Sequence, residues 1–218
     1  MAKSLDANGA AKVFIVGRRE EKLQEVASQA VNKSVIPVQG DLSSKESLST
    51  IISRITSETP FVNCVIANHG AQGPTVNGLP KDRTPSLTEF YDYLWEPSFE
   101  EFNNTFLVNS TGMFYTCVGF LPLLDAGNTH AESPTPTTGV KSQFIITGSI
   151  SAFSRRPGMG FAYSGSKAAA TLLMKQLSTM MVPYHIRANM INPGIYPSDM
   201  SNVSHREAIV GLALHYAH

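Results

Sequence analysis

Short apolar runs alternate with helical patterns along most of this 218-residue chain. Runs rich in β-branched residues indicate buried strands, and apolar residues that recur every three or four positions indicate helices. The expected strands are residues 12–17, 34–39, 62–68, 144–149 and 186–192, and the expected helices are residues 2–8, 19–31, 44–57, 98–124 and a segment that opens near residue 163. This alternation predicts βαβ units, and therefore an α/β fold with a doubly wound parallel sheet in a single domain that spans residues 1–218.

Three polar residues stand around the end of the strand expected at 144–149. Ser149 ends this strand, and Tyr163 and Lys167 lie four residues apart at the start of the following helix, so their side chains share one helix face. A fixed positive charge beside a phenol favours the phenolate, which makes proton exchange with an alcohol or a carbonyl feasible. The three residues predict an acid–base site for a carbonyl/alcohol pair, although the Tyr-x-x-x-Lys spacing alone also fits a surface helix.

The strand that ends in Ser149, the loop that contains glycine and the helix that opens with Tyr163 together resemble the short-chain dehydrogenase/reductase family. The family's Ser, Tyr and Lys match Ser149, Tyr163 and Lys167, with a Ser-to-Tyr gap one residue longer than usual, which we interpret as a small insertion around residues 154–157. The resemblance implies a Rossmann-like fold and an NAD(P)-dependent enzyme that interconverts a ketone or aldehyde and an alcohol.

Asn109, in the segment Leu-Val-Asn-Ser-Thr-Gly, matches the family's fourth catalytic residue. In family members this Asn bends its helix and holds a water that links the catalytic Lys to solvent. Asn is unfavourable in the middle of a helix by intrinsic propensity, which gives mild support for a special role. A buried amide with satisfied hydrogen bonds is the structural alternative.

An arginine pair indicates which dinucleotide the chain holds. An acid near the end of the second strand of such a fold bonds the ribose 2′-hydroxyl of NAD, whereas an arginine accommodates the 2′-phosphate of NADP. Here the strand 12–17 runs into Arg18 and Arg19, and the nearest acid, Glu20, comes later, at the helix start. We therefore expect NADP(H) rather than NAD(H), with an ordinary solvated arginine pair as the alternative.

Asp41 and Leu42 follow the strand 34–39, where family members place an Asp near the adenine. The alternative is that Asp41 is an acid at a helix N-terminus that Ser43 caps.

The segment after the strand 62–68 is a further match to the family. Ala67-Asn68-His69-Gly70 resembles the family's Asn-Asn-Ala-Gly motif. Ala67 and His69 differ from the motif, whereas Asn68 and Gly70 match it and are residue types that favour a turn. A lone His at this position is more often a packing variant than a catalyst.

The segment after the last expected strand resembles the family's Pro-Gly-x-x-x-Thr-x-Met sequence, which lies over the nicotinamide. It begins with Pro193 and Gly194, and Ser198 stands where the family's Thr bonds the carboxamide. The alternative is a plain turn from strand to loop, because Pro-Gly is a common breaker of regular structure.

Composition limits the partners and the location of the protein. A formal net charge of +0 at pH 7 gives no basic excess for nucleic acid. We find no apolar stretch of about 18 residues and no charged-then-apolar leader, so we expect neither a membrane span nor a secretory signal, and a cytoplasmic protein. Cys64 and Cys117 are expected as reduced core residues. The six His show no ligand spacing, so no metal site is expected.

Two connections and one helix bear on substrate and assembly. Residues 71–97 form a long connection whose aromatic cluster, residues 90–95, we expect to pack on the next helix, with a cover over the substrate as the alternative. Residues 126–142 are expected to be an exposed polar loop. The small residues 168–170 permit close approach of another helix, and the resemblance implies a homodimer or homotetramer.

The family's first strand and Gly-rich turn, which hold the cofactor pyrophosphate, have no counterpart before residue 12. Residues 201–218 indicate one helix with no final strand after it. We therefore expect a sheet that is incomplete at both ends and weak dinucleotide binding. The strands 12–17 and 62–68 either close up and pair with each other, which would distort the cofactor site, or keep unpaired edges, which would favour aggregation. The alternative function is a truncated, non-catalytic relative that acts as an interaction or regulatory partner.

Overall fold

The structure is a computed structural model that describes residues 1–131, 140–156 and 158–194. In chain order its elements are α1 (Ala2–Ala7), β1 (Val13–Gly17), α2 (Glu20–Ser28), β2 (Val35–Gln39), α3 (Lys45–Thr56), β3 (Cys64–Ala67), α4 (Leu87–Trp95), α5 (Phe99–Phe106), the π-helical turn η1 (Leu107–Gly112), α6 (Met113–Ala131), β4 (Gln143–Thr147), the 3₁₀ turn η2 (Ile150–Ala152), α7 (Phe161–Met180), the 3₁₀ turn η3 (Val182–Tyr184) and β5 (Arg187–Ile191).

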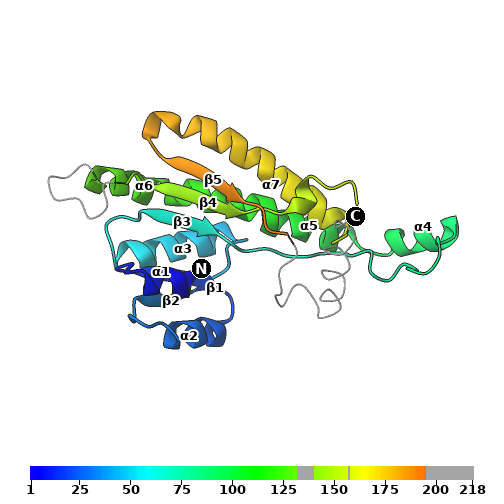
Figure 1. The fold of residues 1–218 in the computed structure, drawn as a ribbon, viewed down its shortest axis with the longest axis horizontal. Helices are drawn as coiled ribbons and strands as arrows, with labels where there is room; N and C mark the ends of the chain where they lie inside the picture. Colours follow the sequence, from blue (N-terminus) through cyan, green and yellow to red (C-terminus); the bar gives the residue numbers. More distant parts are fainter. Residues whose placement is uncertain (132–139, 157, 195–218) are drawn as a thin grey trace, which may run out of the picture.

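The strands form two parallel sheets. β1 pairs with β2, and a second sheet has the order β3-β4-β5. Within the described part of the chain, no strand joins the sheet of β1 and β2 to the sheet of β3, β4 and β5 (Figure 1). The predicted α/β fold with a parallel but incomplete sheet is confirmed, and β1 and β3 do not pair with each other.

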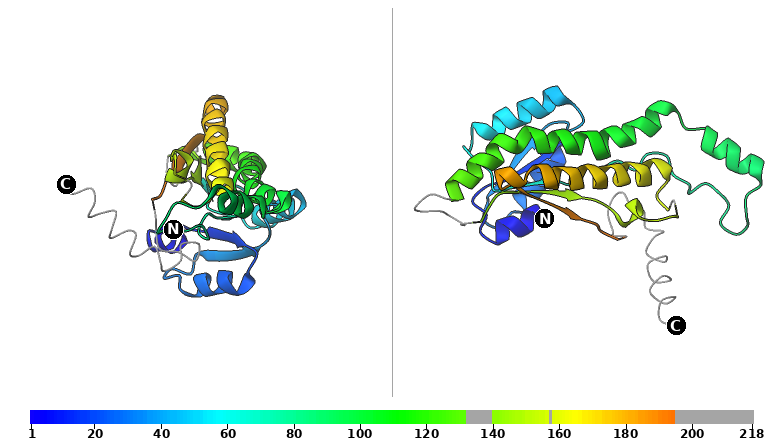
Figure 2. Two further views of the ribbon diagram at one scale, coloured as in Figure 1. Left: turned by 90° about the vertical axis from the view of Figure 1, so that its right-hand side faces the viewer. Right: turned by 90° about the horizontal axis from the view of Figure 1, so that it is seen from above.

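Strand β1 shows why helices cover both faces. Its side chains alternate between faces, as in any strand. Val13 and Ile15 pack with residues around α1 and α2, whereas Phe14 and Val16 pack against the main core. On the main-core side α3, α6 and α7 lie in a row (Figure 2, right). The chain is therefore wound on both sides of its strands, as the alternation of patterns predicts.

The main core lies between these three helices and the strands. Three large side chains at its centre, Ile51, Leu124 and Phe144, are at most 1% exposed. Burying one such side chain stabilises a fold by about 1.5–3 kcal/mol. This core fixes α7 over β4 and β5, and so places the first turns of α7 beside the carboxyl ends of β3 and β4.

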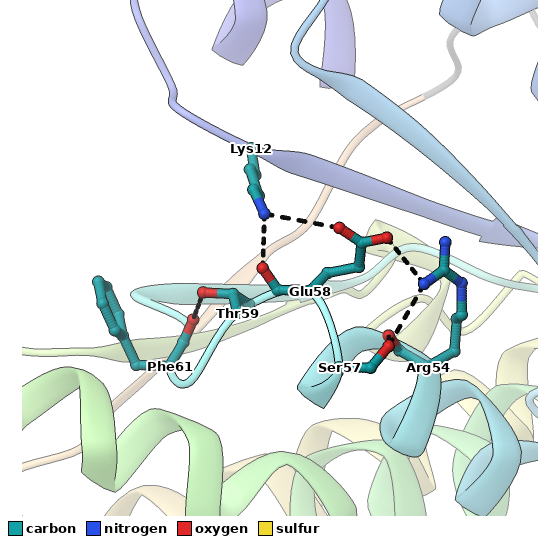
Figure 3. A network of polar contacts seen from close by, with 6 residues as sticks. All are labelled: Lys12, Arg54, Ser57, Glu58, Thr59 and Phe61. Carbon is teal, nitrogen blue, oxygen red and sulfur yellow. Dashed lines mark hydrogen bonds and ion pairs between the residues drawn. The ribbon is translucent and has the colours of Figure 1, made fainter.

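A polar network joins β1 to the turn before β3 (Figure 3). The Lys12 ammonium donates to the Glu58 backbone carbonyl at 2.5 Å and lies 3.6 Å from its carboxylate. The same carboxylate pairs with Arg54 at 2.7 Å. Exposed ion pairs of this kind contribute about 0–1 kcal/mol, so the network aligns the two sheets at one end more than it stabilises them.

The expected packing of residues 90–95 is wrong. These residues lie on α4, which buries no side chain and projects from the body of the molecule (Figure 1). Trp95 is 73% exposed, and its ring stacks on Tyr91 with centroids 5.7 Å apart. A capping box of Ser86 and Glu89 starts this helix, so local interactions stabilise it without a partner.

Two further expectations need correction. Helix α6 continues to Ala131, so the polar loop expected at 126–142 begins later, and residues 132–139 lie outside the described part. Cys64 is exposed at the start of β3 and is not a core residue, whereas Cys117 is fully buried and both thiols are free. The helix expected at 201–218 also lies outside the described residues.

One helical run in the described residues, Phe99–His130, is long and apolar enough by composition to cross a membrane. Half of its most apolar window is buried inside the protein. Core helices of globular proteins meet the same criterion, so the run is weak evidence for a span, and its packing against α3, β3 and α7 accounts for its composition.

Candidate active site

A chain of hydrogen bonds runs across the carboxyl ends of β3 and β4. The Lys167 ammonium donates to the Thr147 backbone carbonyl at 2.7 Å, and the Thr147 hydroxyl donates to Asn68 Oδ1 at 2.7 Å. Thr147 is the last residue of β4, and Asn68 follows β3 directly. Because parallel strands end at the same edge of a sheet, this edge collects polar groups from both strands and from α7.

Tyr163 and Lys167 occupy successive turns of α7 on its buried face, as the sequence predicts. They are 9% and 5% exposed, and the ammonium lies 5.9 Å from the centroid of the phenol ring. Burial lowers the pKa of Lys167 from 10.5 to about 8. The lysine therefore presents a charge that is poorly hydrated and lies close to the aromatic ring.

Ser149 lies two residues beyond β4 and is 7% exposed. Its Oγ accepts a hydrogen bond from the Ser151 backbone N–H at 3.1 Å and so caps the turn η2. Turn η2 packs against α7, which carries Tyr163. As a hydroxyl, Ser149 keeps its own O–H as a donor for a substrate oxygen.

Asn109 lies inside the π-helical turn η1, where the helix pattern predicted a buried amide. Its Oδ1 accepts from the Ala71 N–H at 2.8 Å, and its Nδ2 donates to the Ala71 carbonyl at 2.8 Å and to Ser166 Oγ at 2.9 Å. π-Helical turns inside α-helices are frequent at functional sites. The amide ties the segment after β3 to the first turns of α7.

Two serines complete this network and were not singled out from the sequence. Ser166 Oγ donates to the Tyr163 carbonyl at 2.8 Å, and Ser110 Oγ donates to the Ser166 carbonyl at 2.8 Å. Ser166 is fully buried and stands directly before Lys167. The segment Tyr-Ser-Gly-Ser-Lys contains two serines with the same hydroxyl group. Residue type therefore does not say which of them is buried, and only the position of Ser166 on the helix face could have indicated it.

Asp41 lies just beyond β2, and its carboxylate accepts hydrogen bonds from a residue two positions further along the chain. Its Oδ1 accepts from the Ser43 N–H at 2.9 Å and from the Ser43 hydroxyl at 2.5 Å. These two bonds hold the pKa of Asp41 below its usual range, with a smaller contribution from Arg18. The N-cap of α3 is Ser44, not Ser43, so the helix-cap interpretation of Asp41 is not what the structure shows.

Leu42, beside Asp41, is half-buried, and its side chain packs against the main core.

The arginine pair follows β1. Arg18 is exposed, and its carbonyl accepts from Gln39 Nε2 at 3.1 Å, which ties it to the end of β2. Arg19 is the N-cap residue of α2, whose first turn carries Glu20 and Glu21. Both arginines thus stand at the same edge of the β1–β2 sheet as Asp41.

Gly70 follows His69 in the turn after β3 and does not have a positive φ. The glycine with positive φ in this connection is Gly73, at +67°, and the Thr105 side chain occupies the space where a Cβ at Gly73 would lie. Glycine is required at Gly73 by both conformation and space, and the sequence analysis did not single this residue out.

Pro193 and Gly194 follow β5 and lie against the site. The Pro193 carbonyl accepts from the Ile150 N–H at 3.3 Å, which joins the end of β5 to turn η2 beside Ser149. Ser198 lies outside the described residues.

A cleft of about 580 Å³ opens where residues 73–75 run between α5 and the end of α4. The Pro74 carbonyl lies where a Cβ at Gly160 would stand, and Gly160 directly precedes α7 with a φ of +105°. Only glycine allows this approach. The connection 71–97 therefore runs against the start of the helix that carries Tyr163.

Among the described residues, no group of three or more His, Cys, Asp or Glu side chains is arranged to hold a metal ion.

Comparison with known proteins gives one consistent result. A family model described as short chain dehydrogenase matches residues 1–208. The chain is 45% identical over 204 residues to the short-chain dehydrogenase/reductase PhomF of Diaporthe leptostromiformis, covering 92% of this chain and 66% of that protein. It is 39% identical to the short-chain dehydrogenase/reductase SAT3 of Stachybotrys chartarum, covering 93% of this chain and 77% of that protein. The chain thus spans about two thirds of the length of PhomF.

Solved structures agree on the fold. The Pseudomonas aeruginosa RhlG/NADP active-site complex superposes with a TM-score of 0.70 at 22% identity, over 95% of this chain and 72% of that one. A short-chain dehydrogenase/reductase of unknown function from Caenorhabditis elegans, solved with cofactor, also gives 0.70, at 19% identity, over 95% and 70% of the two chains.

Proposed function

Because the chain belongs to the short-chain dehydrogenase/reductase family, we propose that it is an NADP(H)-dependent oxidoreductase that interconverts a ketone or aldehyde and an alcohol. The observation that carries this proposal is the placement of Lys167. Its ammonium is buried, fixed by the Thr147 carbonyl at 2.7 Å, and 5.9 Å from the Tyr163 ring centroid. A buried cation beside a phenol can stabilise the negative charge that develops on the phenol oxygen during proton transfer, which this reaction needs.

The proposed acid–base group is Tyr163. In the reducing direction its phenol gives a proton to the carbonyl oxygen, and in the oxidising direction the phenolate takes the proton from the alcohol. The hydroxyl of Ser149 holds the same oxygen by donating a hydrogen bond to it. Tyr163 and Ser149 are both nearly buried, so water competes poorly for the substrate oxygen.

Asn109 has a positioning role in this scheme. Its three polar bonds fix α7 through Ser166, whose hydroxyl bonds the Tyr163 carbonyl. One lone pair of Oδ1 accepts from Ala71, and the second remains for a water in the proton relay that the family resemblance implies.

The described residues fit the nicotinamide and ribose end of a dinucleotide. The Lys167 ammonium has three N–H groups, of which the Thr147 carbonyl takes one, so two remain for ribose hydroxyls. Pro193 and Gly194 border this end of the site. When bound, the nicotinamide would supply or accept the hydride, and the protein would supply the proton and the orientation.

The adenosine end carries the cofactor preference. Asp41 and Leu42 would border the adenine, and the arginines at 18 and 19 the 2′-phosphate of NADP. Asn68 and Gly70, in the turn after β3, would pack against the cofactor beside Thr147. The acidic first turn of α2 makes that helix N-terminus a poor anion site, so the preference for NADP rests on the two arginines. The NADP complex among the structural neighbours agrees with it.

Two further expectations belong to this proposal. A homodimer or homotetramer would cover the exposed apolar side chains Tyr115 and Val118 of α6 and Leu172 of α7. The alternative of a non-catalytic relative is not favoured, because the curated relatives carry dehydrogenase or oxidoreductase names.

The direct test is a panel of ketones and aldehydes offered to the purified protein with NADPH or NADH at concentrations up to millimolar. We expect carbonyl-dependent oxidation of NADPH for at least one class of substrate and a lower kcat/KM with NADH. A folded protein that oxidises neither cofactor with any carbonyl, and reduces neither oxidised form with the matching alcohols, would contradict the proposal.

A further inference from the structure

His69 places a polar ring in the interior beside the candidate site. It follows β3 in the turn Asn68-His69-Gly70, where the family motif has alanine. Both ring nitrogens are buried, and neither has an aligned hydrogen-bond partner among the described residues. Buried polar atoms of this kind are rare in folded proteins, and each calls for an explanation.

The ring packs where the turn after β2 meets the π-helical turn η1. Around the position that a Cβ on Gly112 would take, the Leu42 carbonyl lies at 2.7 Å, the Leu107 carbonyl at 3.3 Å and His69 Nε2 at 3.3 Å. A side chain at Gly112 would fill this space, so glycine is what allows the ring to pack against the π-helical turn. The Leu107 carbonyl stands five residues before Gly112 within η1, the spacing of a π-helical hydrogen bond, so the Leu42 carbonyl is the acceptor outside that turn to which the imidazole can donate.

The surroundings keep the ring neutral. Burial, and then the charge of Lys167 on α7, lower the pKa of His69 from 6.5 to about 4, while the charge of Asp41 after β2 and a hydrogen-bonding contact with the Val108 backbone on η1 act in the opposite direction. A neutral imidazole has one N–H, so the tautomer decides which backbone carbonyl it serves.

We propose that His69 is a positioning residue whose Nε2–H is directed at the Leu42 carbonyl while its ring packs on Gly112, and which so ties the turns after β2 and β3 to the π-helical turn that holds Asn109. A small rotation of the ring or one buried water completes the contact. Asn109 in turn clasps Ala71, two residues beyond His69, with two bonds of 2.8 Å. His69 would therefore act on Tyr163 and Lys167 through Asn109.

Nuclear magnetic resonance of the 218-residue protein tests the ring directly. The ¹⁵N shifts of His69 should show a neutral ring with the proton on Nε2 down to about pH 5, and this N–H should exchange slowly with solvent. A proton on Nδ1, a ring charged at pH 6, or a fast-exchanging N–H would overturn the proposal.

Two variants separate polar tethering from packing. His69→Phe keeps an aromatic ring without the donor, and His69→Ala removes both. We expect amide hydrogen exchange at Ala71 to become at least about tenfold faster in both variants, since the segment that Asn109 clasps loses its tether. Wild-type protection in His69→Phe would show that the ring only fills space. His185→Asn, a change on the exposed loop before β5, is the control and should leave Ala71 unchanged.

The effect on catalysis rests on the proposed function, so it is measured separately. With NADPH and a substrate from the carbonyl panel, His69→Phe should lower kcat at least about tenfold with little change in the KM of the carbonyl substrate. If the wild-type protein reduces no carbonyl, the proposed function fails, and the ring and exchange results still decide the role of His69. A raised KM with normal kcat would contradict positioning through Asn109.

Discussion

Replacing Lys167 with methionine is predicted to change how the free energy of unfolding depends on pH. In the folded protein the pKa of Lys167 falls from 10.5 to about 8, because the ammonium is buried. The difference is about 2.5 pH units, and at 1.36 kcal/mol per unit the folded state bears a cost of about 3.4 kcal/mol for the charged lysine. Total stabilities of about 5–15 kcal/mol make this cost large.

The sign follows from proton counts. Between pH 8 and pH 10.5 the unfolded chain keeps the Lys167 proton while the folded protein loses it, so Lys167 makes the protein more stable as pH rises through this window. Below pH 8 the cost is fully present. In Lys167→Met the cost of the buried charge is absent, but the Thr147 carbonyl loses its hydrogen-bond donor, which lowers the free energy of unfolding by about 1–3 kcal/mol. At pH 7 the variant should therefore be more stable by about 0–2 kcal/mol, although inactive.

Urea unfolding followed by circular dichroism, repeated from pH 7 to pH 10.5, measures the effect. Burial raises the pKa of the Cys117 thiol to about 12, which lowers stability above pH 9, but this contribution is common to both proteins and cancels in their difference. The stability advantage of Lys167→Met should fall by about 3.4 kcal/mol across the window. Lys175→Met, on the exposed face of the same helix, controls for loss of a lysine. Parallel pH profiles of Lys167→Met and the wild type would refute the reasoning.

Two other predictions concern the cofactor preference and the thiols. In a protein that includes the family's first strand and Gly-rich turn, Arg18→Ala combined with Arg19→Ala should weaken NADPH binding in calorimetric titration by about 1.5–3 kcal/mol per lost charged bond and leave NADH binding little changed; equal losses for both would show that the pair is structural. In the native protein a thiol reagent should modify Cys64, which is exposed, and spare Cys117, which is fully buried, as mass spectrometry of the labelled peptides can show; rapid labelling of Cys117 would mean that the core opens readily.

The elements that depend on local pattern were predictable. The strands at 12–17 and 34–39 are within one residue of β1 and β2, and Asn8 and Gly9 end α1 as their chemistry indicates. Helix α7 opens two residues before Tyr163, so the shared face of Tyr163 and Lys167 followed from helix geometry alone. Patterns of this kind are local, so one sequence suffices to find them.

Features that depend on tertiary contacts were missed. Nothing in the aromatic pattern of residues 90–95 says whether a partner surface exists, and the structure leaves Trp95 exposed. Gly73 needs glycine because Thr105, distant in sequence, occupies its Cβ space. The acceptor that fixes Lys167 is the backbone carbonyl of Thr147. Every residue has a backbone carbonyl, so the sequence does not indicate which one the lysine contacts.

The measurement that tests the account most directly compares Tyr163→Phe with the wild type in NADPH-dependent reduction of an accepted carbonyl substrate. The substitution keeps the ring and removes the hydroxyl that we assign as the acid, so kcat should fall by about 10²–10⁴-fold while the unfolding midpoint changes little. Tyr184→Phe, at an exposed tyrosine of η3, is the matched control and should retain full activity. Near-normal turnover in Tyr163→Phe would contradict the assignment of the site.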